Sequence, residues 1–112
     1  MCLFCKIAAK QIPSKILFED DDLLAFHDIN PAAPTHVLVI PKQHLTSLGD
    51  AQPEHAALLG KLMLATQRAA QLTGLTAGGW RVAVNTGADA GQSVHHLHLH
   101  VLGGRAMAWP PG

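Results

Sequence analysis

The sequence predicts an α+β protein with a mainly antiparallel sheet, and three observations lead to this fold class. Short segments rich in apolar residues alternate with turns, which is typical of strands. One long stretch, residues 53–72, has the broad apolar face of a buried helix. The order of elements is three strands, the long helix and two strands, with hairpin-like neighbours. Since 112 residues suit one domain, we expect a single domain over residues 1–112.

The first part of the chain is expected to form a short helix and three strands. Residues 4–10 suit a short helix that ends before Pro13, because a proline disfavours helix at the residue preceding it. Residues 15–19 and 23–28 have the pattern of two strands joined by a turn. Residues 36–41 contain a β-branched apolar run, which indicates a buried central strand.

The second part is expected to form the long helix and the last two strands. Pro53 fits the first helical turn, and Gly74 fits a C-terminal stop. Residues 80–85 and 93–102 are predicted strands, and a glycine-bearing loop joins them at residues 86–92. The prediction is therefore a five-stranded sheet with one long and one short helix.

Composition and charge exclude several classes of protein. Eight Lys and Arg balance eight Asp and Glu, so the chain lacks the basic surplus of a non-specific nucleic-acid binder. No apolar run is long enough to span a membrane, and the first residues lack the layout of a signal peptide. Two cysteines are too few for a disulfide framework, and we expect a reducing, cytoplasmic location.

The histidines are the strongest functional signal. The chain has eight, and His96, His98 and His100 alternate with apolar residues. In a strand the three imidazoles would share one face and the apolar residues the other. Such a row can divide the roles of nucleophile, hydrogen-bond donor and ligand. The alternatives are a solvated strand face and a metal site, which would need a third or fourth ligand from elsewhere.

The loop before these histidines is typical of an anion site. Asn85, Gly87, Gly91 and Ser93 lead directly into the predicted last strand. Glycines let backbone N–H groups approach an anion closely, and a serine adds a hydroxyl donor. A phosphate beside a nucleophilic imidazole would fit this combination, whereas an ordinary hairpin loop is the simpler alternative.

These residues carry a resemblance to a known family. Residues 96–102 resemble the histidine triad signature, His-h-His-h-His-h-h, in which h is apolar. The resemblance extends to the histidine triad nucleotide-binding branch through the segments 26–29, 33–36, 39–42, 91–105 and 109–112. It implies a homodimer whose two sheets join into one. It also implies hydrolysis of purine nucleoside phosphoramidates, such as AMP linked to an amine.

The resemblance assigns catalytic roles to five residues. His98 would attack the α-phosphorus and form a nucleotidyl-histidine that water then cleaves, which splits one difficult step into two. His96 would orient His98, partly through its backbone carbonyl, and His100 would donate to a phosphate oxygen. His36 would help to hold the protonation pattern, and Ser93 would contact the phosphate or the leaving amine.

The same resemblance implies a nucleotide-binding pocket. Asp28 would accept hydrogen bonds from the ribose hydroxyls. The residues that would enclose the base are Phe4, Ile7, Ile12, Phe26, His27 and Ile29. The phosphate site would include Asn85, Gly91, Gln92 and Val94. Trp109, in the Pro-rich tail, would lie near the partner subunit's active site and shape the leaving-group side.

Two cysteines near the N-terminus raise the question of zinc. Cys2 and Cys5 form a C-x-x-C pair, which can bind Zn²⁺, act as a redox pair or contribute core sulfur. A redox role would need a thioredoxin-like setting, which this sequence lacks. In some histidine triad proteins such a pair combines with two histidines, and the matching residues here are His44 and His96. The resemblance thus implies a closed structural zinc site, and catalysis would require no cofactor.

Three competing functions differ in what they need from these residues. A dinucleoside polyphosphate hydrolase would share the His98 nucleophile but expel a different leaving group. A non-catalytic nucleotide-binding partner protein would keep Asp28 and the pocket without needing His98. A metal-storage protein would bind several metals per chain. The intact triad and the Trp109 tail favour the phosphoramidate hydrolase.

Overall fold

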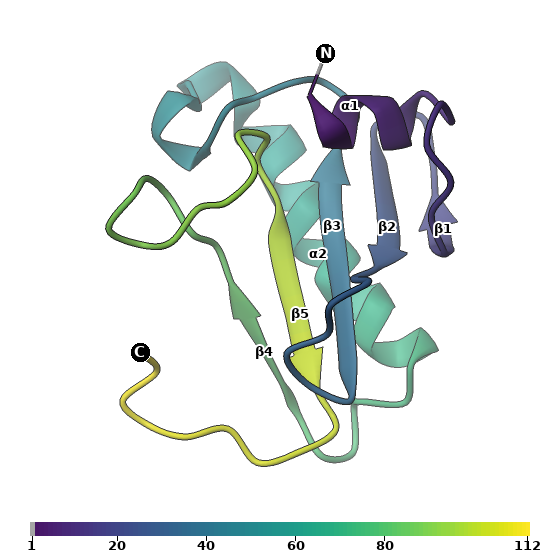
Figure 1. The fold of residues 1–112 in the computed structure, drawn as a ribbon, viewed down its shortest axis with the longest axis vertical. Coiled ribbons are helices and arrows are strands. Elements are labelled where there is room, and N and C mark those ends of the chain that lie inside the picture. The colour runs from purple at the N-terminus through teal and green to yellow at the C-terminus, as the bar shows by residue number, and fades with distance from the viewer. Residues whose placement is uncertain (1) are drawn as a thin grey trace.

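The structure is a computed structural model that describes residues 2–112, and these form a five-stranded antiparallel sheet with the order β1-β2-β3-β5-β4 (Figure 1). The strands are β1 (Ile16–Glu19), β2 (Leu23–His27), β3 (Thr35–Pro41), β4 (Trp80–Ala83) and β5 (Leu99–Gly103). Every neighbouring pair is antiparallel. The predicted fold class is confirmed.

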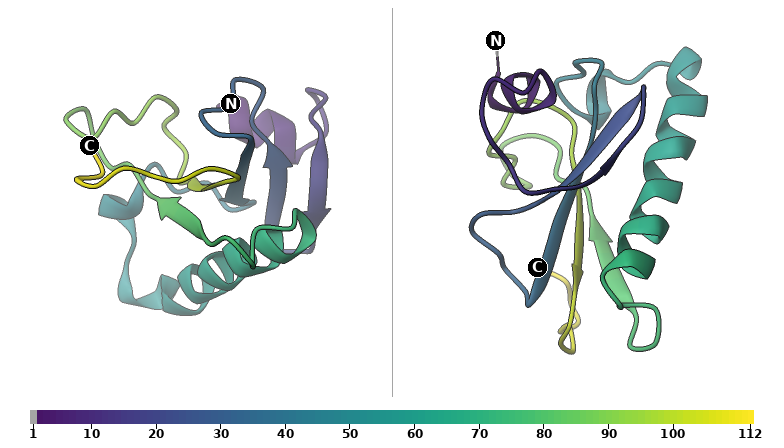
Figure 2. Two further views of the ribbon diagram at one scale, coloured as in Figure 1. Left: turned by 90° about the horizontal axis from the view of Figure 1, so that it is seen from below. Right: turned by 90° about the vertical axis from the view of Figure 1, so that its right-hand side faces the viewer.

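The long helix α2 (Ala56–Leu72) covers one face of the sheet (Figure 2). Its buried residues, such as Leu62 and Ala69, pack on one side of β3 and β5 through Val37, Val39 and Val101. The helix begins later than predicted, because Pro53–His55 forms a 3₁₀ turn first. There the backbone N–H of His55 donates to the Gln52 carbonyl at 2.8 Å, which closes a tighter turn before the α-helix starts, and the Gln52 N–H donates to the His55 ring at 2.9 Å.

The short helix α1 (Leu3–Ala8) lies on the opposite face (Figure 2). It buries Phe4 and Ile7 against a second apolar cluster that contains Phe26 and Leu38. The helix ends before the predicted residue 10, because Lys10 adopts a left-handed conformation with φ 62°. The N–H groups of Lys10 and Gln11 close the helix end on the carbonyls of Ile7 and Lys6 at 3.0 and 2.9 Å.

The last strand is shorter than the predicted 93–102. The ladder between β3 and β5 starts at the pair Val39–Leu99. Leu97 would come opposite Pro41, which has no N–H to donate. The Pro41 carbonyl instead accepts from the His96 ring at 2.8 Å, and the Leu97 N–H donates to Leu45 at 2.6 Å. The segment before Leu99 therefore leaves the ladder and turns its histidines toward the side chains of other elements.

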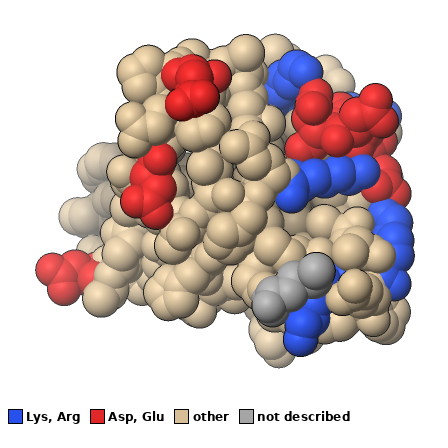
Figure 3. Space-filling view, turned by 90° about the horizontal axis from the view of Figure 1, so that it is seen from above, with Lys and Arg blue, Asp and Glu red and all other residues tan. Residues whose placement is uncertain are grey.

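Some of the surface charges form ion pairs. Lys10 and Lys42 both contact Glu19, and Lys61 lies 2.6 Å from Asp22. On the face shown in Figure 3, basic and acidic residues lie side by side on the right, other acidic residues stand apart on the left, and most of the surface is uncharged. Among residues 2–112, none of the helices has both the length and the apolar character that a membrane span requires.

Candidate active site

The three histidines of the motif lie on the face of the sheet opposite α2. Leu97, Leu99 and Val101 enter the core beneath α2, whereas the rings of His98 and His100 are 5.0 Å apart on the other side. The predicted alternation of faces is therefore present, although it begins before the hydrogen-bonded strand. The buried apolar residues hold this segment firmly, because a shift by one residue would exchange its two faces.

His98 has a defined hydrogen-bond arrangement. Its Nδ1 lies 2.7 Å from the backbone carbonyl of His96, and a carbonyl can only accept, so Nδ1 carries a proton. In the neutral ring the Nε2 atom then has a free lone pair. The ring of Phe4 contacts His98 edge-on, with 5.1 Å between the ring centroids. Both residues line one cavity, so this arrangement provides a nucleophile at a cavity wall.

His100 is oriented by a chain of hydrogen bonds that starts at the backbone. The N–H of Ala32 donates to His36 Nδ1 at 3.0 Å, so the proton of the neutral His36 ring lies on Nε2. That Nε2 is 2.8 Å from His100 Nδ1, which must accept. His100 therefore carries its own proton on Nε2. Within residues 2–112, this Nε2 is the one buried side-chain nitrogen or oxygen without a hydrogen-bond partner. Its N–H is therefore free to donate to a ligand.

Burial keeps the rings of His36 and His100 neutral. It lowers the pKa of His100 to about 4, and the nearby His98 and His36 rings act in the same direction. Burial also lowers the pKa of His36, although the carboxylate of Asp28, 3.5 Å from its Nε2, favours the charged form. Neutral rings at pH 7 are what the hydrogen-bond chain requires. The 2.8 Å between the two ring nitrogens fits one shared proton.

His98 and His100 face a cavity of about 300 Å³, which is within the size range of small-molecule sites. Most of the predicted pocket residues line it, namely Phe4, Ile7, Ile12, Phe26, His27, Asp28, Ile29, Ser93, Val94, His98 and His100. Sequence reasoning missed Leu3, Pro13, Ser14, Asn30 and Leu38. Leu38 could have been found, because it alternates with two residues that point toward α2.

Four of the residues predicted to bind the nucleotide lie outside this cavity lining. Asn85 and Gly91 belong to the loop before the motif. The Gln92 side chain is used within the loops: it accepts from the Gly87 N–H at 2.9 Å and donates to the carbonyls of Thr46 and Val94. Trp109 is 81% exposed. The Gln92 side chain therefore connects backbone segments of two loops through its hydrogen bonds.

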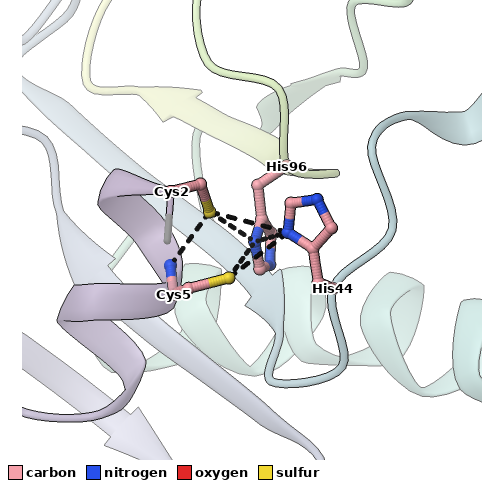
Figure 4. Close-up of side chains that lie close together, drawn as sticks. All are labelled: Cys2, Cys5, His44 and His96. Atoms are coloured by element: carbon pink, nitrogen blue, oxygen red, sulfur yellow. Dashed lines mark hydrogen bonds between the residues drawn. The ribbon is translucent and has the colours of Figure 1, made fainter.

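The predicted metal ligands converge beside the active site (Figure 4). Cys2 and Cys5 come from the start of α1, His44 from the loop after β3, and His96 from the segment before β5. Their sulfur and Nδ1 atoms all lie within 4.8 Å of one another. His96 donates from Nε2 to Pro41, so its neutral ring presents a bare Nδ1 to the group.

The donor set and its spacing fit a tetrahedral metal ion. The sulfur-to-Nδ1 distances are 3.2, 3.3, 3.5 and 3.6 Å, and the two Nδ1 atoms are 3.1 Å apart. Tetrahedral zinc, with Zn–S of about 2.3 Å and Zn–N of about 2.0 Å, separates its ligands by about 3.3–3.8 Å. Two thiols and two imidazoles are also a common structural zinc set, and the bond from His96 to Pro41 is the outer contact that orients such a ligand.

Comparisons with known proteins agree with the sequence resemblance. The family model described as the HIT domain matches residues 9–107. An uncharacterized HIT-like protein of Synechococcus elongatus is 53% identical, and the match covers 98% of this chain and 96% of that protein. A "14 kDa zinc-binding protein" of Zea mays is 49% identical, with 98% of this chain and 87% of that protein covered.

Two solved structures extend the similarity to three dimensions. The HIT family hydrolase of Legionella pneumophila superposes with a TM-score of 0.98 at 47% identity, over 100% of both chains. The histidine triad nucleotide-binding protein of Candida albicans superposes with a TM-score of 0.83 at 31% identity, over 98% of this chain and 83% of that one. Family model, sequence identity and fold agree, and the chain belongs to the HIT domain family.

Proposed function

We propose that this protein hydrolyses purine nucleoside phosphoramidates through a nucleotidyl intermediate on His98. One observation carries the proposal. In its neutral form the His98 ring offers a bare Nε2 at the wall of a mostly apolar cavity, beside the unpartnered N–H donor of His100. The hydrolase and nucleotide-binding names of its structural relatives support the same class of reaction.

The first chemical step uses His98 as the nucleophile. Its Nε2 forms a bond to the α-phosphorus while the bond from phosphorus to the amine nitrogen breaks, and the amine leaves with a proton taken from solvent. The ring becomes positively charged, and the His96 carbonyl stabilises that charge through the proton on Nδ1. The Nε2–H of His100 donates to a non-bridging phosphate oxygen as negative charge develops there.

The second step returns the enzyme to its starting state. Water attacks the same phosphorus and releases a proton to solvent, the bond to His98 Nε2 breaks, and the nucleoside monophosphate leaves. Because His98 regains a neutral ring with its proton on Nδ1, no net proton is consumed by the protein. Ser93 lines the cavity and supplies a hydroxyl on the phosphate or leaving-group side.

The cavity lining supports a nucleoside as the bound group. Phe4, Ile7 and Phe26 provide an apolar enclosure for a base, and Ile29 is an exposed apolar residue on its lining. Asp28 accepts from the N–H of Asn30 through Oδ1 at 2.8 Å. The remaining acceptor sites of this carboxylate are available for the two ribose hydroxyls.

We further propose that Cys2, Cys5, His44 and His96 hold a structural zinc ion. The spacing of their donor atoms supports this, as does the name of the Zea mays relative. Both cysteines are free thiols, as metal ligation requires. Bound zinc would tie α1 to the rest of the fold. The reacting phosphate is assigned to His98 and His100, and no step passes through the metal.

A homodimer is the proposed assembly. β4 is an edge strand of the sheet. Trp80 on that strand and Met63 and Leu64 on α2 are large exposed apolar side chains, 37%, 53% and 68% exposed. Light scattering in solution would then report twice the 11.9 kDa chain mass. A monomer mass at the concentration of the activity assay would contradict this proposal.

The test of the activity compares two substrates and two proteins. An adenosine 5′-phosphoramidate and a diadenosine polyphosphate are offered to the wild-type protein and to His98→Ala. We expect rapid release of AMP from the phosphoramidate, slow cleavage of the dinucleotide, and loss of both in the variant. Preferred cleavage of the dinucleotide would instead assign the related hydrolase. AMP binding without any turnover would identify a non-catalytic nucleotide-binding protein.

A further inference from the structure

Helix α1 contributes side chains to two sites at once: the metal cluster, which is the donor group formed by Cys2, Cys5, His44 and His96, and the nucleotide cavity. Cys2 caps its N-terminus, accepting from the Cys5 N–H at 3.2 Å, and both sulfurs point into the metal cluster. Phe4 and Ile7 lie between and beyond these cysteines and line the cavity. One helical segment therefore presents two sets of side chains, one to each site.

The helix has little stability of its own. It has six residues, and helices of fewer than about 12 residues are marginal in water without tertiary contacts. Its buried residues are Phe4 and Ile7, and Leu3 is 47% exposed. Contacts outside the helix must hold it in place, and these come from the metal cluster on one side and the cavity wall on the other.

The cavity wall also depends on where α1 lies. The Phe4 ring contacts Phe26 with 5.6 Å and His98 with 5.1 Å between ring centroids, edge-on in both cases. His44 and His96, which face the two cysteines, belong to the body of the fold. A metal ion held by all four ligands would fix α1 to that body and so hold Phe4 against the nucleotide.

We propose that metal binding and nucleotide binding are positively coupled through α1. Zinc orders the helix, and the ordered helix completes the base-binding wall. Thermodynamic linkage requires the converse, so a bound nucleotide must tighten zinc binding by the same factor. This inference rests on the proposed nucleotide-binding function and adds a means of regulating that site.

The coupling acts on binding and leaves the chemical step unchanged. His98 keeps its 2.7 Å bond to the His96 backbone carbonyl, and His36 and His100 bond to each other outside the metal cluster. Removal of the metal is therefore expected to raise KM for the phosphoramidate with little change in kcat. A fall in kcat at constant KM would show that the metal acts through His96 on His98 and would overturn the proposal.

The decisive experiment measures both halves of the linkage. Titration calorimetry gives the Kd for AMP of the zinc-loaded protein and of protein treated with a chelator. A competing chelator gives the Kd for zinc with and without saturating AMP at the same pH. We expect AMP to bind at least about five-fold tighter with zinc, and zinc to bind tighter with AMP by an equal factor. Equal AMP affinities in the two forms would overturn the proposal.

Hydrogen exchange supplies a readout that is independent of nucleotide. Zinc is expected to slow amide exchange in residues 3–9 far more than in β3 or α2. If removing zinc abolishes the circular dichroism of the whole chain, the metal supports the entire fold and the local proposal is wrong. If zinc protects α1 but neither form binds AMP, the proposed function fails and the coupling fails with it.

Two variants complete the design. Cys5→Ser removes one ligand, and its AMP affinity is expected to match that of the metal-free wild type and to stay unchanged when zinc is added. Lys10→Ala is the matched control, because it perturbs the chain just after α1 by removing the contact with Glu19 while leaving every metal ligand in place. This control should retain the full response of AMP affinity to zinc. Loss of that response would show that the coupling runs through the ion pair instead.

Discussion

The two faces of the sheet are built from the same strands but have different properties. The face beneath α2 is a continuous apolar core that includes Leu62, Val39 and Val101, each fully buried. The face beneath α1 contains a smaller apolar cluster, a cavity, and the buried rings of His36 and His98. Because side chains alternate along a strand, one strand contributes apolar residues to one face and histidines to the other. The apolar core thereby holds in place polar groups whose burial alone would be unfavourable.

The largest expected effect is the loss of catalytic activity when His98, on the α1 face, is replaced. His98→Ala should lower kcat for the phosphoramidate by more than about 10³-fold, because no other side chain can carry the nucleotide. Stopped assays of AMP release measure this, and calorimetry should still show AMP binding. Turnover within ten-fold of the wild type would show that His98 is not the nucleophile.

The matched change on the α2 face should affect stability and spare catalysis. Leu62→Ala empties a fully buried site and should cost about 2–5 kcal/mol of the free energy of unfolding. Urea denaturation gives the cost, and kcat per folded molecule should remain that of the wild type. A lower kcat in fully folded Leu62→Ala would mean that the two faces are not separable.

A smaller effect is expected at the rim of the cavity. Asp28→Ala should weaken AMP binding by about 1–3 kcal/mol, the cost of losing charged hydrogen bonds to ribose. Asp28→Asn is the control, because it keeps the acceptor for the Asn30 N–H and removes the charge. Unchanged affinity in both variants would exclude Asp28 from the ribose site.

The last expected effect is a change in the pH dependence of stability. The pKa of His100 is about 4 in the folded protein and near its ordinary 6.5 when unfolded, so the unfolded chain binds more protons between these values. The free energy of unfolding should therefore fall as the pH drops from 6.5 toward 4. His100→Gln should make this decline shallower in urea titrations. An identical decline would place the titrating group elsewhere.

The sequence allowed the fold class and the triad face to be predicted because both depend on local periodicity. The strict alternation from His96 to His100 indicates one polar and one apolar face whether or not the segment is in a ladder. The early end of that ladder was not predictable, since it depends on the pairing register, which would bring Leu97 opposite Pro41 if the ladder continued. A pairing register joins residues far apart in the chain, and local patterns do not contain it.

The remaining site residues were predictable to different degrees. The proposed metal ligands followed from the family resemblance, because the spacing from Cys5 to His44 and His96 matches no short metal-binding motif. Leu38 was missed although its alternation placed it on the cavity face. The assignment of Gln92 to the phosphate site stays a prediction. The bonds of its side-chain amide to the backbone of two loops could not be predicted, because they depend on how those loops fold.

The most direct test of the central claim is detection of the covalent intermediate. Wild-type protein is mixed with an adenosine phosphoramidate, quenched during the first turnover at alkaline pH, digested and examined by mass spectrometry. We predict one adenylyl group on the peptide that contains His98, formed and lost at rates that match turnover, and none in His98→Ala. An adenylyl group on a different residue, or full-rate hydrolysis without any adenylated peptide, would contradict the proposed mechanism.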